Sequence, residues 1–198
     1  ASPGRCTNRP YAFQPTGKLR HTRNKLFVVG LGDARAHGRD ALVKLGSDAV
    51  VEAKFSYGKF AKDLQDEDVG LFVRNDQCEW SRVGTATTDD RGIASFRVPA
   101  SQLPAKGRYA FEAVLLADGE AAPGAIYVID GATKAVVFDV DETLTTGNGE
   151  LIEQLITNAT PDMRPDADKI VKAWSEAGWF VAYVTGRPHQ FTDITRKW

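Results

Sequence analysis

The stretch AVVFDVDETLTTG (residues 135–147) places four apolar residues directly before two aspartates that are one residue apart. A segment this uniformly apolar predicts a strand that is buried on both faces, as in a parallel sheet. A second such run, WFVAYVTG (179–186), follows a helical pattern over about residues 167–177. Strand, helix and strand in this order predict parallel strands joined by a right-handed crossover. The C-terminal part of the chain is therefore expected to be α/β.

The helix expected over 167–177 has an apolar face, and its ends carry recognisable signals. Asp166 is expected to cap its start and Gly178 to end it. Further helices are expected near 150–158 and from Pro188 onward. The apolar face follows the helical period and comprises Ile170, Val171, Trp174 and Ala177.

Residues 41–130 have a different pattern, with short apolar runs separated by turn residues. In the first run, Val51, Ala53 and Phe55 alternate with polar residues, which is typical of a half-buried antiparallel strand. Several such strands without a helical period predict an all-β sandwich of immunoglobulin-like character. The domain boundary is expected near residue 131, and residues 1–40 are expected to be irregular with a possible first strand at 26–32. The predicted strands are 49–57, 69–74, 79–86, 92–98, 107–117 and 125–130.

Polar residues follow both strands of the α/β part at their carboxyl ends. Asp139 and Asp141 lie at the first end, and Thr185, Gly186 and Arg187 lie at the second. Ligands of parallel sheets bind outside the carboxyl ends of the strands. We therefore expect a cleft with two carboxylates on one side and a hydroxyl, an amide and a guanidinium on the other. The structural alternative is a buried strand that ends in an acidic turn.

The motifs at these two ends resemble those of a known family. FDVDETLTTG resembles the first motif of the haloacid-dehalogenase (HAD) phosphatases, D-x-D-x-T, and VAYVTGRP resembles the second. The closer likeness is to the domain shared by lipin-type phosphatidate phosphatases and the C-terminal part of membrane-associated phosphatidylinositol transfer proteins. Two longer stretches resemble the latter group, namely DADKIVKAWSEAGWFVAYVTGRPHQFTDITRKW and AKFSYGKFAKDLQDEDVGLFV. The resemblance implies a HAD-like, Rossmann-type parallel sheet over 131–198. The family's third and fourth motifs are not in the 198 residues, so this domain is expected to be incomplete and the chain to be a fragment.

The resemblance also implies roles for the site residues. Asp139 is expected to attack phosphorus, and Asp141 to protonate the leaving oxygen and then activate water. A magnesium ion is expected between the Asp139 carboxylate and the Asp141 backbone carbonyl. Thr143 is expected to steady the loop. Thr185 and the Gly186 amide are expected to hold phosphate oxygens, and Arg187 is expected to bind a phosphate or lipid headgroup.

Three functions follow from these expectations. The first is magnesium-dependent hydrolysis of a phosphomonoester, with phosphatidic acid as the substrate that the resemblance implies. The second is a module that binds phosphatidic acid at a membrane surface without hydrolysing it, as implied for the transfer-protein branch, which lacks the aspartate pair. The third is a phosphatase of small soluble phosphomonoesters. Because the later motifs are missing, activity of the 198-residue chain alone is doubtful.

Composition restricts the partners. The chain is 42% hydrophobic and 26% charged with a net charge of −1, which is typical of a globular protein and argues against broad capture of nucleic acid. No apolar run approaches the roughly 18–20 residues that span a bilayer. Two cysteines, Cys6 and Cys78, and the missing initiator methionine favour an exported, extracytoplasmic protein.

Two charged segments of the first 70 residues are given structural interpretations. Basic residues gather between Lys18 and Lys25, and we interpret them as a solvated lead-in segment rather than a phosphate- or membrane-binding arm. The acidic run DLQDED (63–68) lacks the EF-hand pattern and is interpreted as a solvated loop rather than a calcium site.

Overall fold

The computed structural model describes residues 10–21, 24, 34–58, 61–75, 77–146, 162–188 and 191–197. The chain divides into two compact units, Ala1–Asp130 and Gly131–Trp198, which are described separately. The strand expected at 26–32 and the helix expected near 150–158 lie outside the described residues, as does Cys6. Cys78 is disulfide-bonded.

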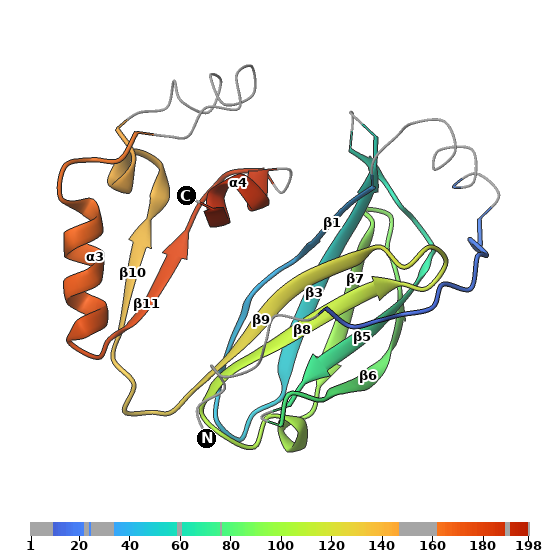
Figure 1. Cartoon of the computed structure of the whole chain (residues 1–198), viewed down its shortest axis with the longest axis horizontal. Coiled ribbons are helices and arrows are strands. Elements are labelled where there is room, and N and C mark those ends of the chain that lie inside the picture. Colours follow the sequence, from blue (N-terminus) through green and yellow to red (C-terminus); the bar gives the residue numbers. More distant parts are fainter. Residues whose placement is uncertain are drawn as a thin grey trace. The chain divides into compact units, whose positions relative to one another are not determined.

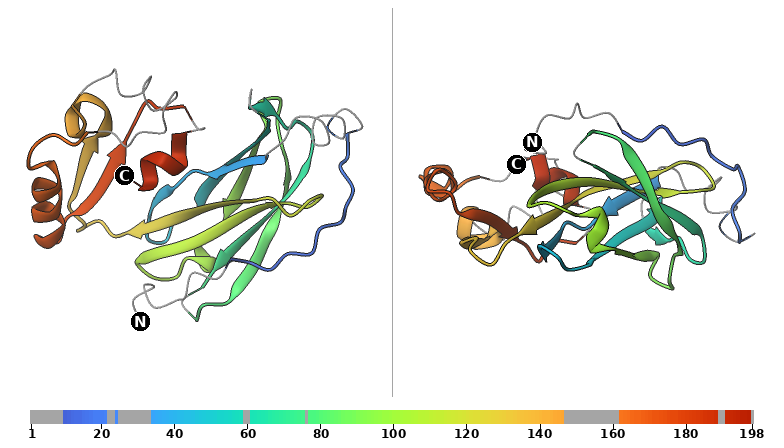
Figure 2. Two further views of the ribbon diagram at one scale, coloured as in Figure 1. Left: turned by 45° about the horizontal axis from the view of Figure 1, so that its top comes forward. Right: turned by 90° about the horizontal axis from the view of Figure 1, so that it is seen from below.

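The first unit consists of two packed β-sheets (Figures 1 and 2). In one sheet, the central strand β3 (Ala49–Tyr57) pairs antiparallel with β1 (Ala34–Gly38), β4 (Lys62–Asp63) and β7 (Ile93–Val98). The other sheet has the order β2-β9-β8-β5-β6, in which only β2 and β9 are parallel. Its strands are β2 (Ala41–Lys44), β5 (Asp68–Arg74), β6 (Trp80–Thr87), β8 (Gly107–Leu115) and β9 (Ala121–Ile129).

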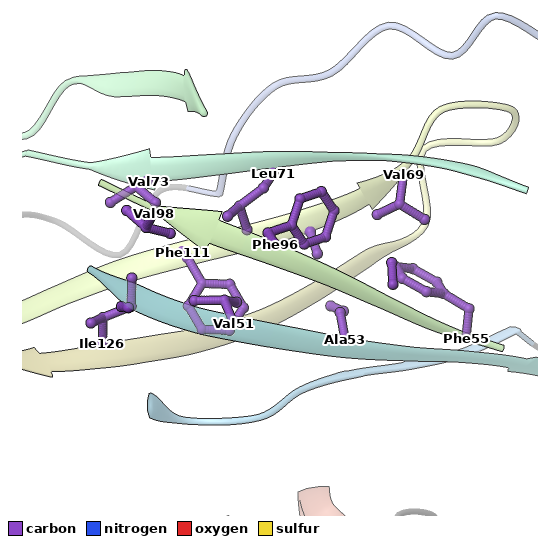
Figure 3. Packing of buried hydrophobic residues seen from close by; sticks show 14 of the residues in the cluster. Val51, Ala53, Phe55, Val69, Leu71, Val73, Phe96, Val98, Phe111 and Ile126 are labelled. Carbon is purple, nitrogen blue, oxygen red and sulfur yellow. The ribbon is translucent and has the colours of Figure 1, made fainter. Parts of the chain in front are cut away.

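Alternating side chains of both sheets form the core between them (Figure 3). Val51, Ala53 and Phe55 of β3 are at most 1% exposed, as the period of two predicts. Burial of a side chain such as Val51 or Phe55 contributes about 1.5–3 kcal/mol. The Phe111 ring lies against β9, where a Cβ at Gly124 would come within 2.2 Å of it. The β-sandwich prediction is confirmed, whereas its immunoglobulin-like character stays a prediction.

An N-terminal arm, residues 10–21 with Asn24, lies on the first unit and is drawn in dark blue in Figure 1. Tyr11 stacks on Phe72 of β5 with ring centroids 4.0 Å apart, and its amide donates to Glu112 of β8 at 2.9 Å. The amides of Thr16 and Gly17 donate to the carbonyls of residues 116 and 117 at 2.9 and 2.8 Å. The basic residues Lys18, Arg20 and His21 are exposed, as a solvated segment requires, but the arm that carries them is attached to the sandwich.

A buried carboxylate holds the other end of the N-terminal arm. Glu67 is 1% exposed and accepts hydrogen bonds from the amides of Arg20 and His21 at 2.8 and 3.1 Å. It also accepts one from the Asn24 side chain at 2.6 Å. The neighbouring Asp68 carboxylate pairs with the Arg20 guanidinium at 2.8 Å. The acidic run is thus not a solvated loop, because the arm supplies its donors.

Within its described residues, the second unit contains two parallel strands, β10 (Ala135–Asp139) and β11 (Phe180–Val184), which pair in register from Ala135↔Phe180 to Asp139↔Val184. Two helices accompany them, α3 (Ala167–Glu176) and α4 (Thr192–Lys197). The parallel pair agrees with the two strands that the apolar runs predict. Their predicted burial on both faces is wrong for the described residues, because Val137, Tyr183 and Val184 are 59%, 55% and 50% exposed. Two strands do not establish a HAD-like sheet, so that part of the fold class stays a prediction.

Helix α3 differs from its prediction at its start and on its face. Asp166 has a left-handed φ of 65° and makes no capping hydrogen bond, because its carboxylate pairs with Lys169 at 2.5 Å. Gly178 has a φ of 80°, a conformation that favours glycine and ends the helix as expected. Ile170 and Trp174 of the predicted apolar face are 52% and 37% exposed. Trp174 packs edge-on against Trp179, with centroids 4.6 Å apart.

Candidate functional site

The two aspartates lie where β10 turns into a short irregular helical turn, η3 (Val140–Leu144). Val140 and Leu144 are buried and anchor this turn, while Asp139 is exposed at the strand end. Asp141 and Glu142 break the helical geometry, and Glu142 has a φ of 63°. Few residues other than glycine adopt this conformation readily. The turn therefore directs the Asp141 side chain away from a regular helical path.

Asp141 meets Thr185 and Arg187 at the end of β11. The Arg187 guanidinium donates through Nε to Asp141 Oδ1 at 2.6 Å, and the Thr185 hydroxyl donates to Oδ2 at 2.6 Å. The Arg187 amide donates to the Thr185 hydroxyl at 3.1 Å, which closes a cycle of hydrogen bonds. The Arg187 side chain is 3% exposed and that of Asp141 is 21% exposed. We call these three residues the Asp141–Thr185–Arg187 cluster.

Asp139 and Thr143 make a separate contact on the same turn. The Thr143 hydroxyl donates to Asp139 Oδ2 at 3.3 Å, and both residues are exposed. Gly186, between the two donors of the cluster, also lies in the open, since a Cβ there would meet nothing within 4 Å. The structure thus brings the predicted site residues to one edge of the parallel pair. Their roles in binding or catalysis stay predictions.

Arg164, which the sequence interpretation missed, holds the turn from the segment before α3. Its guanidinium donates through Nε and Nη2 to the Glu142 carbonyl at 3.1 and 2.8 Å. Its amide donates to the Leu144 carbonyl at 2.8 Å. The Thr145 hydroxyl also accepts a hydrogen bond from the Glu142 amide at 3.2 Å. No local pattern in the sequence could reveal Arg164, because its target is a backbone carbonyl 22 residues earlier.

The predicted magnesium site is not assembled by the residues that the structure describes. Among those residues, no group of three His, Cys, Asp or Glu side chains is placed to hold a metal ion. Of the two predicted ligands, the Asp139 carboxylate is exposed, and the other is the Asp141 backbone carbonyl rather than its carboxylate, which accepts from Thr185 and Arg187. These residues do not make a complete magnesium site, and the metal stays a prediction.

Each unit is similar to one family model. Residues 34–128 match the model of the PITM 1-3 beta-sandwich domain. Residues 136–198 match the model of the PITM 1-3 LNS2 domain. The first match begins at β1, after the N-terminal arm, and the second begins in β10 and includes the Asp141–Thr185–Arg187 cluster.

Similar curated proteins are much longer than this chain. Membrane-associated phosphatidylinositol transfer protein 1 of Rattus norvegicus is 30% identical over 184 residues, 90% of this chain and 14% of the relative. Protein retinal degeneration B of Drosophila melanogaster is 27% identical over 192 residues, 94% of this chain and 15% of the relative. The chain thus spans about a seventh of the length of these relatives. A solved sensor domain of the anti-sigma factor RsgI4 from Pseudobacteroides cellulosolvens covers 51% of this chain and 99% of its own, at 8% identity and a TM-score of 0.38.

These matches correct the family assignment made from the motifs. The motifs assigned the chain to HAD phosphatases of the lipin type together with the C-terminal domain of the transfer proteins. The assignment to a lipin-type phosphatase is wrong. Both family models are of PITM 1-3 domains, and the Rattus norvegicus relative is named as a membrane-associated phosphatidylinositol transfer protein. Nothing in these matches supports the extracytoplasmic location expected from the cysteines, and the Rattus norvegicus relative is named as membrane-associated. Within the described residues, no helix is long and apolar enough to cross a membrane.

Proposed function

We propose that the edge formed by β10 and β11 binds the phosphomonoester head of a membrane lipid, with phosphatidic acid as the candidate ligand. The observation that supports this proposal is the convergence of Thr185 and Arg187 on the two oxygens of one carboxylate, each at 2.6 Å. A phosphate likewise presents several oxygens on one central atom. Charge-assisted contacts from a guanidinium and a hydroxyl are typical of phosphate recognition.

The relatives supply the membrane context of the proposal. The Rattus norvegicus relative is named as a membrane-associated phosphatidylinositol transfer protein, and the matched LNS2 residues include the whole candidate site. The net charge of −1 gives the chain no general attraction to an anionic bilayer. Peripheral contact with a membrane would then depend on recognition of the lipid head at this edge.

Hydrolysis is the second candidate, and the exposed Asp139 carboxylate is the observation that favours it. Its single described hydrogen bond, from Thr143 at 3.3 Å, leaves Asp139 accessible for attack on phosphorus. The leaving oxygen would then need a proton, which the sequence interpretation assigns to Asp141. Both Asp141 oxygens instead accept hydrogen bonds from Thr185 and Arg187. This geometry favours binding over hydrolysis, for a lipid and for a small soluble phosphomonoester alike.

The test is co-sedimentation of the 198-residue chain with phosphatidylcholine vesicles that contain phosphatidic acid. Vesicles of phosphatidylcholine alone and with phosphatidylserine serve as lipid controls. Arg187→Gln is expected to weaken binding to phosphatidic acid about tenfold or more, because it removes a charge-assisted contact. Arg196→Gln, the same charge change at an exposed site in α4, is the matched control. Arg187→Lys is added because it keeps the buried positive charge if Arg187→Gln fails to fold.

Each outcome decides between the candidates. Preferential binding to phosphatidic acid that depends on Arg187, without phosphate release, supports the binding module. Phosphate release that disappears in Asp139→Asn, with magnesium present, supports hydrolysis instead. Release from small phosphomonoesters but not from vesicles supports the soluble alternative. No preference for phosphatidic acid over phosphatidylcholine in any variant would refute the proposed function.

A further inference from the structure

Both donors expected to bind phosphate already have an anionic partner within the chain. Asp141 accepts from Arg187 Nε through Oδ1 and from the Thr185 hydroxyl through Oδ2. The contacts use the two carboxylate oxygens separately, as two oxygens of a phosphate would be used. Because the Arg187 side chain is 3% exposed, solvent screens this ion pair less than a surface pair. An external anion therefore meets donors that are already occupied.

We propose that Asp141 is an internal competitor of the ligand, so that the site accepts an anion only by exchange with this carboxylate. This inference rests on the proposed function and concerns the selectivity of the same site. On exchange, Asp141 releases both donors and rotates towards solvent, and oxygens of the incoming anion replace its Oδ1 and Oδ2. The buried guanidinium is then never left without an anionic partner, which would be costly.

The surrounding contacts restrict the exchange to the Asp141 side chain. Arg164 holds the carbonyl of Glu142, the next residue in the chain, through two hydrogen bonds. On the other side, Arg187 Nη1 donates to the Thr195 hydroxyl of α4 at 3.4 Å, so the guanidinium keeps a second contact. The backbone of the turn and the arginine are thus both held while the carboxylate can rotate. Its side chain is 21% exposed, which gives it a path to solvent.

A ligand must bind Arg187 and Thr185 more strongly than the Asp141 carboxylate does. A phosphodiester lipid carries one negative charge on its phosphate, as the carboxylate does, and gains little over Asp141 in attraction to Arg187. A phosphomonoester approaches two negative charges near neutral pH and offers three terminal oxygens, so it competes more strongly for the same donors. Asp141 therefore lowers affinity for every anion but improves the preference for monoesters over diesters.

The experiment compares the wild-type chain with Asp141→Asn and with Asp168→Asn, which makes the same charge change on an exposed residue of α3. Binding is measured to inorganic phosphate by calorimetry and to vesicles that contain either phosphatidic acid or phosphatidylserine. Asp141→Asn is expected to bind inorganic phosphate and phosphatidic acid roughly ten- to a hundredfold more tightly, because the competing charge-assisted contact is lost. Its preference for phosphatidic acid over phosphatidylserine is expected to shrink. Asp168→Asn is expected to change neither quantity beyond about twofold.

The outcomes separate this inference from the proposed function. Tighter binding of phosphate by Asp141→Asn supports the inference even if the wild type binds no vesicles, in which case the proposed function fails alone. Weaker or unchanged binding by Asp141→Asn overturns the inference, even if the wild type prefers phosphatidic acid. An equal increase in phosphate affinity in Asp168→Asn also overturns the inference, because the increase would then come from the change in net charge and not from the loss of a competitor.

A measurement on the wild-type chain covers the case in which Asp141→Asn does not fold. The NMR signal of the Arg187 Nε–H reports its carboxylate partner. Addition of inorganic phosphate or of short-chain phosphatidic acid is expected to shift this signal together with that of the Asp141 carboxyl carbon. Binding that shifts other signals of the site but leaves these two unchanged would overturn the inference, as would the absence of any shift.

Discussion

Replacing Glu67 with glutamine tests how firmly the N-terminal arm is attached to the sandwich. In the wild type, Oε1 accepts from the His21 amide and the Asn24 side chain, and Oε2 accepts from the Arg20 amide. The glutamine amide oxygen can replace Oε1 and keep its two bonds. Its NH₂ group then faces the Arg20 N–H, so one hydrogen bond is lost and two donors oppose each other.

The expected loss follows from that contact. A hydrogen bond to a charged group contributes roughly 1.5–3 kcal/mol, so the free energy of unfolding should fall by about that amount. The neutral glutamine no longer buries a charge, which reduces this loss, whereas the contact between its NH₂ group and the Arg20 N–H increases it. The loss is measured by urea unfolding, with hydrogen exchange at the Arg20 and His21 amides to localise it. Glu52→Gln is the control, because its carboxylate pairs with Arg39 at the surface, where such pairs contribute about 0–1 kcal/mol. Equal losses in the two variants, with the Arg20 amide still protected, would refute the reasoning.

Two further predictions concern the turn at the site and the burial of Glu112. Arg164→Lys keeps the charge but cannot make both hydrogen bonds to the Glu142 carbonyl. We therefore expect the free energy of unfolding to fall by about 0.5–1.5 kcal/mol and the Thr145 amide to exchange faster. Unchanged exchange at Thr145 would contradict the role of Arg164. Burial raises the pKa of Glu112 above its ordinary value of 4.5, against the opposing effects of the Tyr11 amide and Arg74. The Glu112 carboxyl therefore binds its proton more tightly in the folded state than in the unfolded state. This contributes to the free energy of unfolding below the ordinary pKa, and the contribution is lost as pH rises through the higher pKa of the folded state. Urea unfolding at about pH 4 and about pH 7 should show that the wild type loses more stability than Glu112→Gln over this interval, and parallel pH profiles would contradict this.

The strands of the sandwich were predictable because their signal is local. In β3, the alternation of Val51, Ala53 and Phe55 with polar neighbours specifies both the strand and its buried face. The predicted run 49–57 has the same bounds as β3, and 69–74 differs from β5 by one residue. In contrast, β1 consists of ARAHG, in which the apolar positions of the alternation are held only by alanine, a weak signal. Its pairing with β3 is a tertiary effect that single-sequence patterns do not contain.

The N-terminal arm and the acidic run were misinterpreted for the same physical reason. The interpretation of each segment used only the charges within it, whereas donors of the arm bind carboxylates of the acidic run. Glu67 and the Arg20 amide are 47 residues apart in the chain, so no local window includes both. A buried carboxylate requires donors, and only the folded chain shows where they come from.

At the candidate site, the sequence interpretation located the residues but not their contacts. The rule that carboxyl ends of parallel strands meet at one edge correctly brought Asp141, Thr185 and Arg187 together. It did not indicate that the aspartate would bind the two donors itself. That outcome depends on the direction of the Asp141 side chain, which the non-helical backbone at Glu142 helps to set.

The attachment of the N-terminal arm bears on how such proteins are compared across species. Five of its contacts are donated by main-chain amides, those of Tyr11, Thr16, Gly17, Arg20 and His21. A main-chain amide donates whatever its side chain is, so residues of the arm can be substituted over evolution without loss of these bonds. The arm can therefore vary in sequence while the fold retains it. A domain boundary drawn by similarity, at residue 34, would remove the segment that covers Phe72.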